Sequence, residues 1–314
     1  MSLTPLPPPA TIRLFPYSRL PIKTTQFHKA EYMSTAFPIQ YLGANIEIYS
    51  APPVRGLIQH AVFDFDGTLS LIRAGWQEIM LSLCVEALER TPTAEDRATL
   101  ADICRDFILQ LTGRQTIYQM MRLAEEVRKH GGTPRDPLDY KWQYLNLLQE
   151  KIAHRLENLE QGAEKKPYRV RGSIALLDEL TRRGTTCYLA SGTDEPFVIA
   201  EAKLLGIDHY FSERIYGARD DYQSFSKQML LEQICNDHGL HGAELAVFGD
   251  GYVEIESARS VDGIAIGIAS LESGEQGWDE WKKERLRTAG AQIMVPDWQE
   301  SALLLSFLFG ETDV

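Results

Sequence analysis

Short apolar runs alternate with amphipathic helical segments along the second half of the chain. Apolar residues recur at helical spacing at residues 172–183, 195–205, 225–236, 279–289 and 298–308. Between them lie short, β-prone runs near residues 187–191, 210–216, 245–248, 264–268 and 292–295. Helical spacing of apolar residues is typical of amphipathic helices, and short β-prone apolar runs are typical of buried strands, so the first group of segments predicts helices and the second predicts strands. Their alternation predicts an α/β fold whose parallel, doubly wound sheet carries helices on both faces.

One more apolar run, at residues 58–63, precedes a long stretch without strand signals. Helical spacing continues from residue 74 to about residue 161, and turn residues near 91, 112 and 131–134 divide it into four predicted helices. We expect these helices at residues 74–88, 94–111, 116–129 and 137–159. The pattern therefore predicts an α/β core formed by residues 39–72 and 166–314, interrupted by an all-helical insertion at residues 73–165.

Residues 1–38 have a different composition. Six prolines fall within residues 5–21, and no continuous apolar segment accompanies them. Proline at this density prevents a long amphipathic helix, so neither a secretory signal nor a transit peptide fits. We expect a disordered or polyproline-like arm, with Met33 as an alternative start of translation. Residues 39–56 would then add an edge strand or an extended lead-in to the core.

Composition favours a globular enzyme of the cytoplasm. The 314 residues are 44% hydrophobic and carry a net charge of −12. This charge argues against nucleic acids and anionic membranes as partners, because both require a basic surface. The apolar run at residues 302–309 is too short to cross a bilayer. Four scattered cysteines, without a Cys-x-x-Cys pair, indicate reduced thiols in a cytosolic protein. The oligomeric state stays open.

The most informative segment is the end of the first apolar run, Val-Phe-Asp64-Phe-Asp66-Gly67-Thr68. Residues i and i+2 of a strand point the same way, so the two aspartates should project together from its carboxyl end. Open α/β sheets bind their ligands at that edge. Two adjacent carboxylates are stable only with a cation or a shared proton. The plain alternative is an Asp-Gly turn after a buried strand.

This string resembles the first motif of the haloacid dehalogenase superfamily. There the first aspartate is a nucleophile and the second a general acid/base. The family also has a strand that ends in Ser or Thr, then a lysine, and then a strand that ends in an acid. The chain offers Ser191 before Gly192, Lys227, and Asp250 after Gly249, in the same order. The resemblance spans roughly residues 58–308 and implies an α/β core of the Rossmann type.

The resemblance also implies a role for each of these residues. Asp64 and Asp66 would be catalytic. The side chains of Asp64 and Asp250, with the backbone carbonyl of Asp66, would bind Mg²⁺. The remaining group would hold the phosphoryl oxygens and consists of Ser191, Gly192 and Lys227. Because Asp66 is a carboxylate, the resemblance favours a phosphatase or phosphomutase over a dehalogenase or a transporting ATPase.

One position departs from the family pattern. The fourth motif commonly has a second aspartate four residues after the first, and here that position holds Glu254. Glutamate is one methylene longer, so Glu254 would either reach the metal through water or hold a neighbouring group instead.

The insertion resembles the helical, C1-type cap of the phosphoglycolate phosphatase and phosphomutase branches. Arg73, at the start of the insertion, and Arg114, in one of its loops, are candidates for substrate binding, because guanidinium groups bind carboxylates and phosphates in a bidentate manner. Each could equally be a solvated surface residue.

These features together predict a Mg²⁺-dependent phosphatase that acts on a small phosphate ester through an aspartyl-phosphate. The substrate would be a phosphoglycolate-like acid or a sugar phosphate. A phosphomutase of the β-phosphoglucomutase type is the alternative, since it would use the same two aspartates. A non-catalytic binding protein is disfavoured, because every expected catalytic position is filled.

Overall fold

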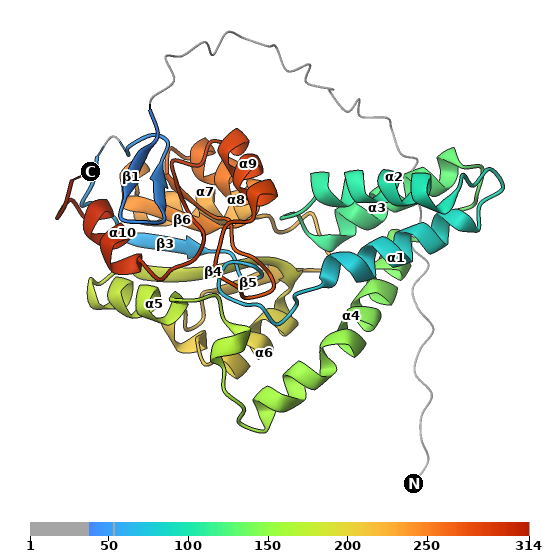
Figure 1. Ribbon diagram of the computed structural model, residues 1–314, viewed down its shortest axis with the longest axis horizontal. Coiled ribbons are helices and arrows are strands. Elements are labelled where there is room, and N and C mark those ends of the chain that lie inside the picture. The colour runs from blue at the N-terminus through green and yellow to red at the C-terminus, as the bar shows by residue number, and fades with distance from the viewer. Residues whose placement is uncertain (1–37, 53, 314) are drawn as a thin grey trace. The chain divides into compact units, whose positions relative to one another are not determined.

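The computed structural model describes residues 38–52 and 54–313. The predictions for a disordered arm and for Met33 therefore lie outside the described residues, apart from Pro38 at the end of the arm. The described part of the chain is an α/β structure in which helices surround one sheet and a group of four helices extends from it (Figure 1).

The sheet has eight strands in the order β1-β2-β8-β7-β6-β3-β4-β5. Strands β3 to β8 run parallel, whereas β1 and β2 form an antiparallel hairpin that pairs with β8 at one edge. The bounds are β1 Gln40–Leu42, β2 Ile46–Ile48, β3 His60–Phe63, β4 Thr186–Asp194, β5 Ile215–Ala218, β6 Leu245–Gly249, β7 Ile264–Ile268 and β8 Ile293–Val295. The predicted parallel core is confirmed, and residues 39–56 add two edge strands.

Helices cover both faces of the sheet, as a doubly wound fold requires. Buried residues of α5, α6 and α10 form one apolar cluster against the sheet, and buried residues of α7, α8 and α9 form another. The bounds are α5 Ser173–Arg182, α6 Glu195–Leu205, α7 Lys227–His238, α8 Tyr252–Ser260, α9 Glu280–Ala289 and α10 Ser301–Leu308. The predicted α/β fold class is therefore confirmed on both faces.

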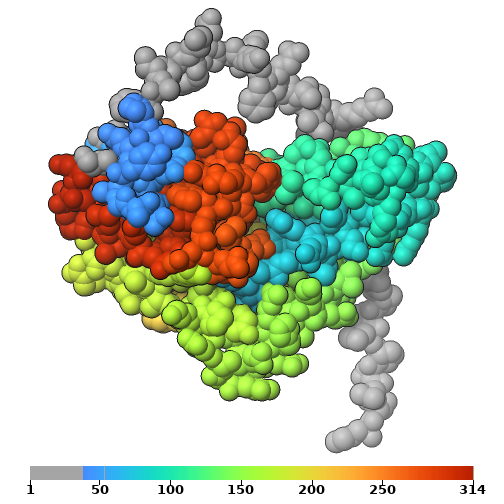
Figure 2. All heavy atoms as spheres, viewed as in Figure 1, coloured from blue at the N-terminus to red at the C-terminus, as the bar shows by residue number. Residues whose placement is uncertain are grey.

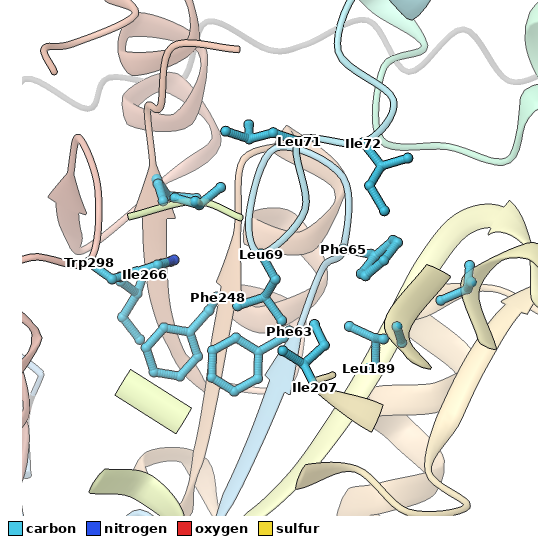
Figure 3. Close-up of a cluster of buried hydrophobic side chains, with 14 of the residues drawn as sticks. Phe63, Phe65, Leu69, Leu71, Ile72, Leu189, Ile207, Phe248, Ile266 and Trp298 are labelled. Carbon is cyan, nitrogen blue, oxygen red and sulfur yellow. The ribbon is translucent and has the colours of Figure 1, made fainter. Parts of the chain in front are cut away.

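The first cluster is packed around aromatic rings close to the catalytic strand. Phe63 stacks on Phe248 with ring centroids 4.5 Å apart, and Trp298 meets Phe248 edge-on at 5.7 Å. Figure 3 shows the rings of Phe63 and Phe248 beneath the turn that carries Leu69. The indole nitrogen of Trp298 donates to the carbonyl of Thr68 at 2.8 Å. The loop after β3 is thus anchored to the core directly behind the two aspartates.

Four helices interrupt the core between β3 and β4, as the sequence predicts. They are α1 Trp76–Glu89, α2 Arg97–Gln110, α3 Thr116–Lys129 and α4 Pro137–Glu160. Asp96 caps α2 through the backbone amides of residues 98 and 99, and Asp136 followed by proline starts α4. Among residues 38–52 and 54–313, no helix is long and apolar enough to cross a membrane.

Buried polar contacts join the insertion to the core. Arg155 on α4 donates to the carbonyls of Ile72 and Ala74, at 2.6 and 2.9 Å, where the chain enters the insertion. Lys141, also on α4, forms an ion pair with Asp194 at the end of β4, with Nζ 2.5 Å from Oδ1. These contacts hold α4 against the core edge that carries the two aspartates.

One predicted strand is displaced. The sequence predicts a strand near residues 210–216, whereas residues 208–210 form a 3-10 turn and β5 begins only at Ile215. Tyr216 pairs with Ala190 of β4, but the two aromatic residues before β5 lie outside the sheet. Phe211 is fully buried in the apolar cluster, and the hydroxyl of Tyr210 donates to Asp178 of α5 at 2.5 Å.

Candidate active site

The ends of three neighbouring strands form the floor of the candidate site. β3 pairs in parallel with both β4 and β6, so the three strands end at the same edge of the sheet. Asp64 follows β3, Asp250 follows β6, and Ser191 lies within the longer β4. Asp66, Gly192 and Lys227 line the same pocket. The structure therefore brings the predicted catalytic and phosphate-binding residues together.

Asp64 is buried against a lysine. Its Oδ1 lies 2.6 Å from Nζ of Lys227, the first residue of α7. Burial raises the pKa of Asp64 to about 6, the negative charge of Asp250 adds to that rise, and the ammonium group of Lys227 opposes it. An ionised Asp64 is thus stabilised chiefly by Lys227 in the described chain. A carboxylate held this way is an anion next to a cation, as phosphoryl transfer requires.

Asp66 is even more strongly perturbed. Burial raises its pKa to about 7; Arg73 opposes the rise, whereas Glu201 and Asp64 add to it. Its Oδ2 accepts a hydrogen bond of 2.8 Å from the Thr193 hydroxyl, whereas Oδ1 is buried and has no partner within the described residues. A carboxyl group with a pKa near neutrality can both donate and accept a proton, which is the requirement for a general acid/base.

The turn after β3 explains why a glycine follows Asp66. Gly67 has a φ of 75°, and a Cβ there would come within 2.1 Å of Oδ2 of Asp250. Any side chain at this position would therefore push the turn and Asp250 apart. Nζ of Lys282 donates to Oδ2 of Asp250 at 2.8 Å and forms an ion pair with it, and Lys282 is 5% exposed.

The donor set suits a small, hard cation. Lys227 engages one oxygen of Asp64 and Lys282 one oxygen of Asp250, so each carboxylate keeps an oxygen that no described side chain contacts. Within the described ranges no three His, Cys, Asp or Glu side chains gather as a metal cluster. Mg²⁺ is usually held by one or two carboxylates together with waters. Asp64 and Asp250 meet that requirement.

Glu254 lies behind the lysine. It is 2% exposed, and its Oε1 pairs with Nζ of Lys227, while Oε2 is buried without a partner in the described part of the chain. Cβ atoms at Gly249 and Gly251 would collide with the Glu254 side chain. The contacts therefore favour a role in positioning Lys227, and direct metal binding by Glu254 stays a prediction.

The two candidate arginines differ sharply. Arg73 is 4% exposed and bound to Glu201 of α6, with Nε 3.1 Å from both carboxylate oxygens and Nη2 2.7 Å from Oε1. Its donors are engaged within the protein, although its side chain lines the pocket. Arg114 is exposed, lines the pocket, and donates from Nε to the Tyr252 hydroxyl at 3.2 Å. A substrate contact by Arg114 stays a prediction, whereas Arg73 joins the start of the insertion to α6 of the core.

These arrangements fit one known family. Residues 58–262 match the haloacid dehalogenase-like hydrolase family. The chain belongs to the haloacid dehalogenase-like hydrolases. The resemblance carried by the Asp64 motif is confirmed, and so is the expectation that the protein is a hydrolase. No protein with a curated description matches the chain in sequence.

Solved structures of this family share the fold at low identity. A HAD hydrolase of family IA, variant 3, from Entamoeba histolytica is 20% identical, covers 80% of this chain and 99% of its own, and has a TM-score of 0.52. A predicted phosphatase from Clostridium acetobutylicum is 17% identical over 80% and 99% of the two chains, with a TM-score of 0.51. A conserved haloacid dehalogenase-like protein of unknown function from Agrobacterium tumefaciens is 16% identical over 79% and 98%, with a TM-score of 0.52.

Sequence reasoning missed part of this hydrolase's pocket. Helix α9 contributes Trp281, Lys282 and Arg285 to the lining. Their segment has the composition of a solvated helix, and only the packing of α9 beside β7 brings these three side chains to the pocket. Thr193, which donates to Asp66, could have been found, because it lies two residues after Ser191 on the same strand and so faces the same way.

Proposed function

We propose that this hydrolase is a phosphatase that cleaves a small phosphate monoester through an aspartyl-phosphate on Asp64. The observation that carries the proposal is the pairing of two buried carboxyl groups after β3 that lie in different electrostatic surroundings. Asp64 is bound to Lys227 at 2.6 Å, while the pKa of Asp66 is raised to about 7. A carboxyl group held beside an ammonium group and a second one whose pKa lies near neutrality suit a nucleophile paired with a general acid.

Asp64 attacks phosphorus, and the bond from phosphorus to the leaving oxygen breaks. Protonated Asp66 gives its proton to that oxygen, so that an alcohol leaves rather than an alkoxide. Asp66, now ionised, then takes a proton from the water that attacks the aspartyl-phosphate. Inorganic phosphate is released and both carboxyl groups return to their first state. The hydrogen bond from Thr193 keeps Asp66 oriented through both steps.

Charge on the phosphoryl oxygens is met by groups on three elements. Lys227 supplies an ammonium, Ser191 a hydroxyl, and Gly192 a backbone amide, all lining the same pocket as Asp64. A Cβ at Gly192 would lie 2.9 Å from the carbonyl oxygen of Arg114, so this glycine lets the insertion approach the strand end. Donors fixed in advance stabilise the developing charge without reorganisation.

Mg²⁺ would be held by Asp64, Asp250 and the backbone carbonyl of Asp66. When bound, it would offset the repulsion between the nucleophile and the substrate's anionic oxygens.

The four helices of the insertion would act as a lid over the site and exclude bulk water, which strengthens these electrostatic interactions. A lid of this kind restricts the substrate to small molecules such as a phosphorylated acid or a sugar phosphate, without nucleic-acid or membrane partners. The free cysteines at residues 84, 104, 187 and 235 support a cytoplasmic location.

The test is phosphate release from a panel of small phosphate esters with Mg²⁺, by the wild type and by Asp64→Asn. We expect the wild type to turn over and Asp64→Asn to retain less than about 1% of its activity, because loss of a nucleophile costs several orders of magnitude. Retention of more activity would refute the assignment of Asp64. Turnover that needs a sugar bisphosphate activator and yields an isomer would identify a mutase instead. No release from any ester would refute the proposed activity.

A further inference from the structure

Helix α9 places a cationic and aromatic group in the pocket that the proposed chemistry does not use. The guanidinium carbon of Arg285 lies 4.5 Å from the ring centroid of Trp281 and 4.9 Å from that of Tyr252. Contact with two aromatic rings fixes the guanidinium and leaves its edge for a ligand. Arg285 therefore has the geometry of a preoriented anion receptor at one side of the pocket.

Arg285 has no acidic partner in the described chain. Neither its ion pairs nor its hydrogen bonds include a carboxylate, whereas its neighbour Arg287 on the same helix binds Glu284 at 2.6 Å. Burial lowers the pKa of Arg285, and the nearby carboxylates of Asp250 and Glu256 oppose part of this fall, although neither forms an ion pair with it. A half-buried cation in this condition gains more from an incoming anion than a solvated one does.

A second guanidinium approaches from the insertion. Nε of Arg114 donates to the Tyr252 hydroxyl at 3.2 Å, on the same ring that Arg285 covers. Both arginines line the pocket that contains Asp64. Figure 2 shows the orange surface that includes α9 beside the cyan surface of the insertion. Two guanidinium groups therefore contact Tyr252: that of Arg285 from the core and that of Arg114 from the insertion.

The other cations of the pocket are already engaged. Lys227 pairs with Asp64 and Glu254, Lys282 pairs with Asp250, and Arg73 pairs with Glu201. A negative group on the far end of a substrate would therefore meet Arg114 and Arg285 rather than these three residues.

We infer that Arg285, together with Arg114, forms a subsite for a second anionic group on the leaving portion of the substrate. The subsite deepens the proposed function and rests on it. It selects phosphate esters that carry a further carboxylate or phosphate over esters with a neutral leaving group. Because the two arginines come from the core and the insertion, the same anion would also draw the insertion onto the core.

The test compares 3-phosphoglycerate with glycerol 3-phosphate, which differ by the carboxylate, and 1,3-propanediol bisphosphate with 1,3-propanediol monophosphate. In at least one pair, we expect the wild type to have the higher kcat/KM for the member that carries the additional anionic group. That pair shows whether the subsite binds a carboxylate or a phosphate. Arg285→Gln should reduce this preference about 10-fold to 100-fold, mainly through KM, since a charge-assisted hydrogen bond is worth about 1.5–3 kcal/mol. Arg285→Lys should retain part of the preference.

Arg287→Gln is the matched control, because Arg287 lies on the same helix and faces Glu284. It should keep the wild-type preference. The subsite would be refuted if folded Arg285→Gln kept the wild-type preference, or if the wild type had the same kcat/KM for both members of each pair. Turnover of the esters would still support the phosphatase in either case.

If the wild type hydrolyses neither these esters nor any other ester of the panel, the proposed function fails, and calorimetric titration of 3-phosphoglycerate and glycerol 3-phosphate into the protein still decides the subsite. Tighter binding of 3-phosphoglycerate that Arg285→Gln abolishes would support it. Equal binding of the two compounds would refute it.

Discussion

Replacing Arg73 with methionine separates the structural role of this arginine from the substrate-binding role that the sequence predicts. Three contacts of 2.7–3.1 Å join Arg73 to Glu201, and the two side chains are 5% and 3% exposed. Breaking one side of such a buried pair costs about 3–5 kcal/mol, because the remaining charge is left without compensation. For a domain of this size, that corresponds to a fall in Tm of at least about 6 °C.

The assay is thermal and urea unfolding of the wild type and three variants. Arg73→Met should be strongly destabilised, whereas Arg73→Met/Glu201→Met should recover most of the loss, since an apolar pair can replace a buried ion pair. Arg97→Met is the matched control in the insertion. Its pair with Glu89 has the same 2.7 Å separation but is 61% and 35% exposed, so it should cost at most about 1 kcal/mol.

Kinetics supply the second readout. Arg73 lowers the pKa of Asp66, so its loss should move the alkaline limit of kcat to higher pH. The reasoning is refuted if Arg73→Met unfolds like the wild type and only raises KM for anionic substrates. That outcome would restore Arg73 as a substrate ligand.

Two further predictions concern the carboxylates of the site. Burial raises the pKa of Asp66 from 3.8 to about 7, so the folded state retains a proton that the unfolded state loses between these values, and the free energy of unfolding should fall as pH rises across this window. Asp66→Asn should flatten that pH dependence and stabilise the protein at pH 8 while it suppresses turnover, and a wild type whose stability is level across the window would contradict this. Lys282 holds Asp250 at 2.8 Å, so Lys282→Met should remove a competing positive charge and tighten Mn²⁺ or Mg²⁺ binding in calorimetry several-fold. Weaker metal binding in this variant would mean that Lys282 orients Asp250 instead.

The predictions that succeeded depend on strand geometry. Asp64, Ser191 and Asp250 could be placed together from the sequence because each lies at the carboxyl end of a predicted parallel strand, and parallel strands share that edge. Lys227 was singled out by the family resemblance, and it is the first residue of α7. The insertion was equally visible, because four helical segments in succession leave no strand to continue the sheet.

The missed features depend on partners that are distant in the sequence. Arg73 resembles a substrate ligand by its nearness to the Asp64 motif, and only the fold reveals Glu201, which lies 128 positions away. Arg285 belongs to a charged helical segment that gives no sign of burial in its spacing. Periodicity identifies the face of a helix that packs on the core, but a pocket at a strand end can also recruit side chains from the other face.

The charges of the chain make the location of these arginines physically significant. An anionic substrate approaches a protein with a net charge of −12. At physiological ionic strength, charges separated by more than about 8 Å are largely screened, so nearby cations decide whether the substrate binds. Lys227 and Lys282 are neutralised by Asp64, Glu254 and Asp250. The positive charge that could attract a second anionic group of the substrate then lies at Arg114 and Arg285, where the core meets the insertion. Substrate choice and closure of the insertion would therefore draw on the same two positive charges.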